Sequence, residues 1–131
     1  MGPWVAAGGI NGFVAVAMGA FAAHGLRAML DPGALVWIET GSRYQLIHAL
    51  ALLGVALLIG NGKGAFRPLL QAVAWAFLIG SALFAGSLYL LAFTGIEAFA
   101  WLTPIGGIAL LGAWAALACY GVLHWRRMSG R

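Results

Sequence analysis

Long apolar stretches alternate with short polar ones along the chain. The apolar stretches cover residues 4–23, 43–60, 68–93 and 104–125. As α-helices rising about 1.5 Å per residue, they match the roughly 30 Å hydrocarbon core of a bilayer. The pattern predicts an all-α membrane protein: a single domain over residues 1–131, built as an antiparallel bundle of four transmembrane helices.

A further helix is expected before the second span. Residues 32–40 contain several apolar side chains but are too few to cross the bilayer. Asp31 can cap the first turn, and Pro32 suits the first helical position. Trp37 suits the headgroup region, where tryptophan is enriched. We therefore expect a short interfacial helix over residues 32–40.

Composition indicates that lipid surrounds the chain. Hydrophobic residues make up 63% of the sequence and charged residues 8%, and the mean hydropathy is +0.97. A soluble domain carries about 25% charged residues, and a chain of 131 residues cannot bury so much apolar surface in its own core. Membrane lipids are the expected partners, and a homo-oligomer or a larger membrane complex stays open. The chain has no basic stripe with interleaved aromatics, so we expect no nucleic-acid partner.

The basic residues predict an orientation. With four spans, both termini and the connection after the second span lie on one side of the membrane. That side carries more basic residues than the other, and cytoplasmic segments are enriched in lysine and arginine. We therefore expect both termini in the cytoplasm. The residues on the two sides are Lys63, Arg67, Arg126, Arg127 and Arg131 against Arg27 and Arg43.

Small residues recur on one face of several spans. Helices in lipid associate through close approach of their backbones, which small residues permit. Such positions therefore predict helix-packing faces. The glycines selected on this ground are Gly8, Gly12 and Gly19 in the first span, Gly86 in the third and Gly107 in the fourth.

The segment Arg43-Tyr44-Gln45-Leu46-Ile47-His48 brings polar groups to the start of the second span. At about 100° per residue, its tyrosine, glutamine and histidine fall on one arc. Polar groups in a membrane helix face the bundle interior or a wet cavity. We therefore expect a polar pocket in the first two turns of this span, near the outer side of the membrane. Its candidate residues are His24, Arg43, Tyr44, Gln45, His48, Ser87 and Tyr89.

An interhelical hydrogen-bond network is the alternative to an open pocket. The same side chains, together with Asn11, can bond one another and serve as packing contacts between helices. An unpaired amide is costly in lipid, which favours a partner for Asn11 on a neighbouring helix. The sequence leaves the pocket and the network both open.

Catalytic and metal-binding sets are incomplete. His24 and His48, on adjacent helices, could hold a haem or a metal. However, His24 ends its helix while His48 lies inside the next, and the only further acids nearby are Glu39 and Asp31, so we expect no metal and no cofactor. Ser87 and His48 have no acidic residue at their depth to complete a catalytic set. The four spans contain no Asp or Glu, which argues against a proton-coupled exporter. We favour a role that is not enzymatic.

Sequence blocks in all four spans carry a resemblance to a known family. They read GAFAAHGL at 19–26, RYQLIHAL at 43–50, GSLYLL at 86–91 and TPIGG at 103–107. In order and spacing they resemble the family of small four-span membrane proteins that includes the animal transmembrane protein 256. Ala22 stands where this family usually has glycine. The resemblance implies a multi-pass protein of the bacterial inner membrane, or an organellar relative, and implies no activity.

These observations lead to one interpretation and one alternative. We interpret the chain as a non-enzymatic membrane protein with a packing, scaffold or lipid-interacting role. The alternative is a transporter or channel for a small solute or anion, built around Arg43 and His48.

Overall fold

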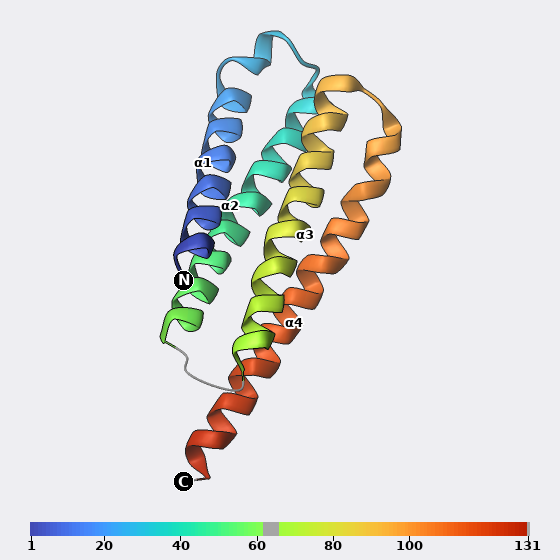
Figure 1. The fold of residues 1–131 in the computed structure, drawn as a ribbon. Helices are drawn as coiled ribbons and strands as arrows, with labels where there is room; N and C mark the ends of the chain where they lie inside the picture. The colour runs from blue at the N-terminus through green and yellow to red at the C-terminus, as the bar shows by residue number, and fades with distance from the viewer. Residues whose placement is uncertain (62–65, 131) are drawn as a thin grey trace.

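The computed structural model describes residues 1–61 and 66–130, and this part of the chain forms four long helices (Figure 1). Each is long and apolar enough to cross a membrane. The predicted all-α membrane architecture is therefore confirmed. The long helices are α1 (Gly2–Ala23), α2 (Pro32–Asn61), α3 (Arg67–Thr94) and α4 (Leu102–Ser129), and two short 3-10 helices connect them, η1 (Leu26–Ala28) and η2 (Glu97–Trp101).

Local signals fix several helix ends. Asp31 caps α2, because its Oδ1 accepts a hydrogen bond from the Ala34 backbone N–H at 3.0 Å. Gly95 ends α3 with a φ of 68°, in the left-handed region that glycine adopts without steric cost. Helix α4 begins at Leu102, so Thr103 is inside its first turn and does not cap it.

The short interfacial helix predicted over residues 32–40 is not a separate element, because α2 runs unbroken from Pro32 to Asn61. Gly41 stands at the expected boundary, but it serves close packing: a Cβ there would lie 2.8 Å from Cε1 of Tyr89. A glycine inside a helix costs only about 1 kcal/mol relative to alanine, so the helix continues through it.

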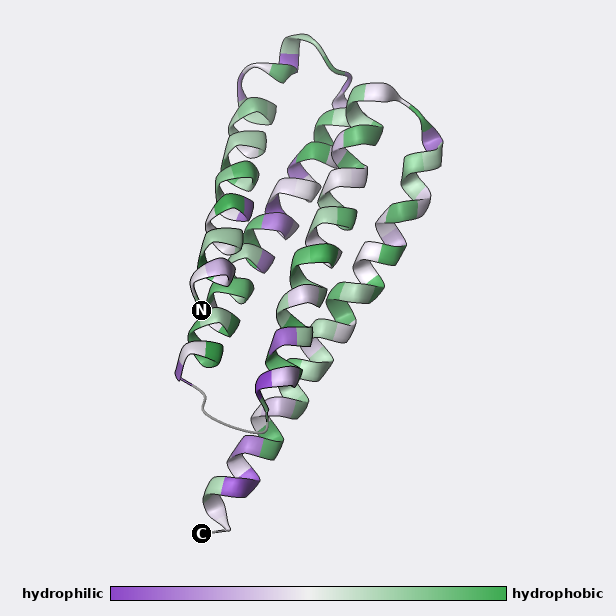
Figure 2. Cartoon of the chain, viewed as in Figure 1, coloured by the Kyte–Doolittle hydropathy of each residue, from purple (hydrophilic) through white to green (hydrophobic). Residues whose placement is uncertain are grey.

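The continuous helix changes the depth of the polar segment. At about 1.5 Å per residue, His48 lies about 24 Å from the start of α2 and about 20 Å from its end. The polar residues that were expected near the outer edge of the membrane therefore lie halfway along the helix. Figure 2 shows the same pattern, with apolar helices and hydrophilic positions both at the ends and midway.

The four helices follow one another in a row, and both termini lie at the same end (Figure 1). Helices α2 and α3 form the central pair, α1 packs on α2, and α4 packs on α3. Within the described ranges, the α1 and α4 backbones do not contact each other. The outer helices are accordingly less buried. In an apolar stretch of 18 residues from each helix, 22% of the stretch is buried in α1 and 17% in α4, against 39% in α2 and 44% in α3.

Apolar side chains form two buried clusters. The larger one lies toward the termini and joins all four long helices. The smaller one lies toward η1, where α1, α2 and α3 meet. Their buried members are Trp4, Leu52, Val55, Ala56, Ile59, Leu70, Val73, Ala74, Phe77, Leu110 and Ala113 for the larger cluster, and Ala22, Ala34, Ile38 and Ala92 for the smaller.

The glycines predicted on α1 all face α2. A Cβ at Gly8 would lie 2.7 Å from Cδ2 of Leu53, and a Cβ at Gly19 would lie 3.3 Å from Oγ of Ser42. Gly12 has more room, with the nearest atom, the Ala49 Cβ, at 3.8 Å. Close approach of α1 to α2 therefore depends most strongly on Gly8.

The glycines predicted on α3 and α4 behave differently. A Cβ at Gly86 would meet nothing within 4 Å, so the packing role expected for Gly86 is wrong. At Gly107 the nearest atom, on the Phe84 ring, would lie at 3.9 Å, an ordinary contact. The close approach is made instead by Gly106, where a Cβ would lie 2.5 Å from the Phe84 backbone nitrogen and 2.9 Å from the Gly80 carbonyl oxygen.

We predict that Gly106→Ala lowers the free energy of unfolding by about 1–3 kcal/mol, the usual cost of overpacking. The added methyl would collide with the backbone of α3, which cannot turn aside as a side chain can. Unfolding in mixed micelles of rising SDS content, followed by circular dichroism, measures the effect. Gly112→Ala on the same helix is the matched control, because its Cβ would meet nothing within 4 Å. Equal stability of the two variants would contradict this account of α3–α4 packing.

Candidate functional site

Buried polar side chains gather halfway along the helices, between the two apolar clusters. Asn11 of α1, Gln45 and His48 of α2, and Ser81 of α3 are each at most 7% exposed. Each lies near the middle of its helix. The candidate site is therefore a polar layer at the depth of the hydrocarbon core.

One part of this layer is a hydrogen-bond network joining α1, α2 and α3. Tyr89 donates its hydroxyl to Oε1 of Gln45 at 2.7 Å, and Gln45 Nε2 donates to Oδ1 of Asn11 at 2.8 Å. Ser81 donates to the same Asn11 oxygen at 3.4 Å. Across the described residues, every buried side-chain nitrogen and oxygen has a hydrogen-bond partner. The network meets the requirement that polar groups in lipid be satisfied internally.

His48 forms the other part of the layer. Its Nδ1 lies 2.6 Å from the Tyr44 carbonyl oxygen, and its Nε2 lies 3.2 Å from Nε1 of Trp114. A carbonyl oxygen can only accept and an indole N–H can only donate. The proton of the imidazole is therefore on Nδ1, and Nε2 is an acceptor. These two bonds describe a neutral histidine that links α2 to α4.

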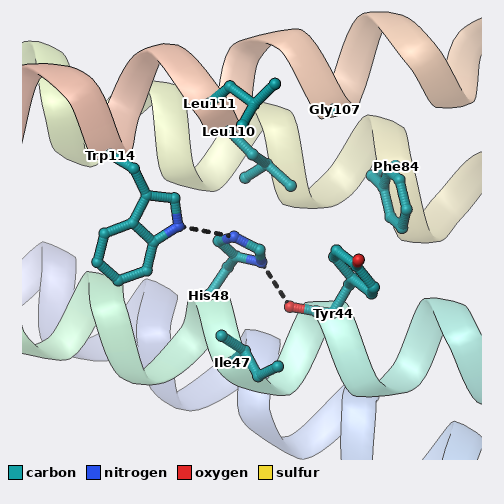
Figure 3. A pocket seen from close by; sticks show the side chains of 8 residues that line it. All are labelled: Tyr44, Ile47, His48, Phe84, Gly107, Leu110, Leu111 and Trp114. Carbon is teal, nitrogen blue, oxygen red and sulfur yellow. Dashed lines mark hydrogen bonds between the residues drawn. The ribbon is translucent and has the colours of Figure 1, made fainter.

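A groove with a cavity volume of about 480 Å³ lies beside His48, between α2 and α4 (Figure 3). Its volume is within the range of about 300–1,000 Å³ found for small-molecule sites. Four lining side chains are 44–71% exposed, so the groove opens on the surface that faces lipid. The lining residues are Tyr44, Ile47, His48, Phe84, Gly107, Leu110, Leu111 and Trp114.

The seven residues predicted for one pocket do not meet in one place. Gln45 and Tyr89 belong to the network, whereas Tyr44 and His48 line the groove. Ser87 is buried elsewhere, bonded to the Thr103 hydroxyl at 2.7 Å. The two remaining residues, His24 and Arg43, are exposed. The single pocket is replaced by two adjoining features because α2 presents Gln45 toward α1 and α3, and His48 toward α4.

Comparison with known proteins places the chain in a family. The family described as "Protein of unknown function (DUF423)" matches residues 18–107. The chain belongs to this family. The matched range contains Gln45, His48 and Tyr89 and ends before Trp114.

Bacterial relatives match over most of their length. The chain is 48% identical over 112 residues to a "UPF0382 membrane protein" of Haemophilus influenzae, covering 86% of each chain. It is 39% identical over 121 residues to the "UPF0382 inner membrane protein YgdD" of Escherichia coli K12, covering 90% of this chain and 87% of the relative. It is 37% identical over 118 residues to the "UPF0382 membrane protein YwdK" of Bacillus subtilis, covering 89% and 94%. No solved structure matches the chain.

Membership of the DUF423 family agrees with the resemblance found in the sequence and supports an integral membrane protein. The family description names no activity. A function for this chain therefore has to be argued from the geometry of the polar layer and the groove.

Sequence reasoning missed several residues of these features. Trp114, Ser81 and Phe84 were not among the residues selected as site candidates. A usable signal existed for Trp114: tryptophan is enriched at membrane interfaces, yet Trp114 lies in the middle of an apolar span. A tryptophan at that depth needs a hydrogen-bond acceptor, and His48 supplies it.

We predict that Tyr89 and Gln45 are energetically coupled. In a double-mutant cycle of Tyr89→Phe and Gln45→Leu, we expect a coupling energy of about 0.6 kcal/mol, and at most about 1.7, the range for hydrogen bonds between membrane helices. SDS-induced unfolding of the variants measures it. Tyr44→Phe is the control, because its hydroxyl has no partner among the described side chains and its ring packs on Phe84 at 4.7 Å. A coupling of zero would show that the network does not hold α2 to α3.

Proposed function

We propose that this is a non-enzymatic, lipid-interacting membrane protein whose groove between α2 and α4 holds the hydrocarbon chain of a membrane lipid. The observation that carries the proposal is a cavity of about 480 Å³ with a mostly apolar lining, open on the lipid-facing surface midway along the helices. The medium at this depth consists of lipid chains. A lipid chain therefore reaches the groove without leaving its own environment.

The chemistry of the lining supports an uncharged occupant. None of its eight residues carries a carboxylate, an ammonium or a guanidinium group. His48 is neutral in the hydrogen-bonding pattern described above. Tyr44, Phe84 and Trp114 supply aromatic walls, which suit a flexible apolar chain.

The transporter alternative has less support from the geometry. Arg43, which was expected to provide the charge for an anion, is exposed and does not line the groove. The buried amides and hydroxyls near the middle of the helices bond one another. A scaffold role in a homo-oligomer or a larger complex stays a prediction, with the outer faces of α1 and α4 as the surfaces for it.

We predict that purified protein in mild detergent retains a phospholipid, and that Gly107→Leu releases it. A leucine at this position would extend into the groove, since a Cβ there contacts only the Phe84 ring, at 3.9 Å. Native mass spectrometry counts the lipids retained per chain.

Gly112→Leu is the matched control for this prediction. It makes the same substitution on the same helix, at a position with open space that does not line the groove. We expect it to retain lipid as the unmodified protein does. Equal retention by both variants, or no retained lipid in the unmodified protein, would overturn the proposal.

We further propose that the protein resides in the inner membrane with both termini in the cytoplasm. The Escherichia coli relative is named an inner membrane protein. Both termini lie at the end of the molecule that carries Arg67, Arg126 and Arg127, which agrees with the distribution of basic residues in cytoplasmic segments (Figure 1). Lys63 and Arg131, which also entered the sequence prediction, lie outside the described residues.

Labelling of single cysteines tests the orientation. The exposed Cys119 is first replaced by alanine. We predict that a membrane-impermeant maleimide labels Ser129→Cys in inverted vesicles and Glu97→Cys in right-side-out vesicles, because these positions lie at opposite ends of the helices. The reverse result would place the termini outside the cytoplasm.

A further inference from the structure

We infer that the groove selects a lipid whose chain carries an uncharged hydroxyl group deep in the membrane, and that His48 and Trp114 together bind this hydroxyl. The inference rests on the proposed function, because it names the chemical class of the lipid that the groove would hold. It depends on the hydrogen-bonding groups that the groove presents and on their depth.

His48 and Trp114 present one acceptor and one donor to each other across the groove (Figure 3). The His48 Nδ1–H is already committed to the Tyr44 carbonyl oxygen at 2.6 Å, which leaves Nε2 as an acceptor. The Trp114 Nε1–H, at 3.2 Å from it, is a donor only. The groove therefore offers an acceptor and a donor that lie side by side.

A hydroxyl group is the complement of this pair. It can donate its hydrogen to His48 Nε2 while its oxygen accepts the Trp114 N–H, so both protein groups stay satisfied when their direct bond opens. A ketone oxygen would accept from Trp114 but leave Nε2 without a donor. A plain methylene chain would leave the direct His48–Trp114 bond in place. No proton is transferred in any of these arrangements.

The depth of the pair determines where on the lipid the hydroxyl must be. His48 lies about 20 Å or more from either end of α2, at about 1.5 Å per residue. A charged headgroup at that depth would be costly. A hydroxyl borne along the hydrocarbon chain reaches this depth while the headgroup stays at the interface. The apolar side chains of Ile47, Leu110 and Leu111 then contact the chain beside the hydroxyl.

The backbone arrangement allows the His48–Trp114 bond to open. Over the described ranges, the α2 and α4 backbones do not contact each other, since each packs on α3. Insertion of a hydroxyl between the two side chains therefore does not separate a packed helix pair. By contrast, the bonds of Gln45 to Asn11 and Tyr89 join helix pairs that pack directly on each other, α2 with α1 and α2 with α3.

The test compares three uncharged probes of equal chain length in detergent micelles. They are methyl ricinoleate, which has a mid-chain hydroxyl, the ketone made by oxidising that hydroxyl, and methyl oleate, which lacks it. The Trp114 indole N–H signal in a ¹H–¹⁵N spectrum reports binding and is assigned by its loss in Trp114→Phe. The indoles of Trp101 and Trp125, which are 79% and 67% exposed, are internal references for bulk micelle effects.

We expect methyl ricinoleate to shift the Trp114 signal at a roughly tenfold lower mole fraction than either other probe, the effect of one additional net hydrogen bond. His48→Phe, which removes the acceptor but keeps an aromatic ring, should abolish this preference. His124→Phe, a histidine outside the groove on the exposed end of α4, should preserve it. If His48→Phe does not fold, the comparison of hydroxyl and ketone probes on the unmodified protein decides the question.

Each outcome supports or overturns the inference. Equal binding of all three probes, or of the hydroxyl and ketone probes, would overturn hydroxyl selection while leaving the groove as a lipid site. The lipid site itself is tested separately by native mass spectrometry. It requires that the unmodified protein and Gly112→Leu retain lipid and that Gly107→Leu loses it. If no probe shifts Trp114 and no lipid is retained, both the hydroxyl selection and the proposed function are wrong.

Discussion

The absence of water around membrane helices is the constraint that shapes this protein most, and the Gln45–Asn11 hydrogen bond shows how the chain meets it. Apolar side chains gain little by leaving lipid for a helix interface, because lipid chains are equally apolar. Directional contacts must therefore set the register between helices. The bonds from Tyr89 to Gln45 and from Gln45 to Asn11 do this for α1, α2 and α3 at one level, between two apolar clusters.

Helix α4 is positioned by different means, and the groove is the consequence. Gly106 brings α4 close to the α3 backbone near the η2 end, where a Cβ would find no room. Nearer the middle, α4 faces α2 across a gap, because the helices form a row and α4 has no backbone contact with α2 in the described ranges. Side chains partly fill the gap, and Trp114 reaches His48 across it. The open row thus leaves a cavity that a closed bundle would fill.

The sequence predicted the four long membrane helices, because each contains a long apolar run, but it placed the start of the second at Arg43 instead of Pro32. It failed where a local signal had two meanings. Residues 32–40 resembled a separate interfacial helix but are the first turns of α2, which continues through Gly41, a packing position against Tyr89. This error placed the polar segment near the membrane edge. Periodicity put Gln45 and His48 on one arc of α2, yet it could not show that two different neighbours divide that arc.

The network and the groove differ in how readily they can exchange partners. Network bonds of 2.7 and 2.8 Å join buried or half-buried groups on neighbouring packed helices, so an incoming molecule would have to separate those helices to replace them. The His48–Trp114 bond is longer, at 3.2 Å, and spans a cavity open to lipid. Replacing this bond requires only that the His48 and Trp114 side chains separate enough to bond another group. Adjacent faces of α2 therefore have different roles. Gln45 joins α2 to α1 and α3, and His48 lies in the groove, where a ligand can contact it.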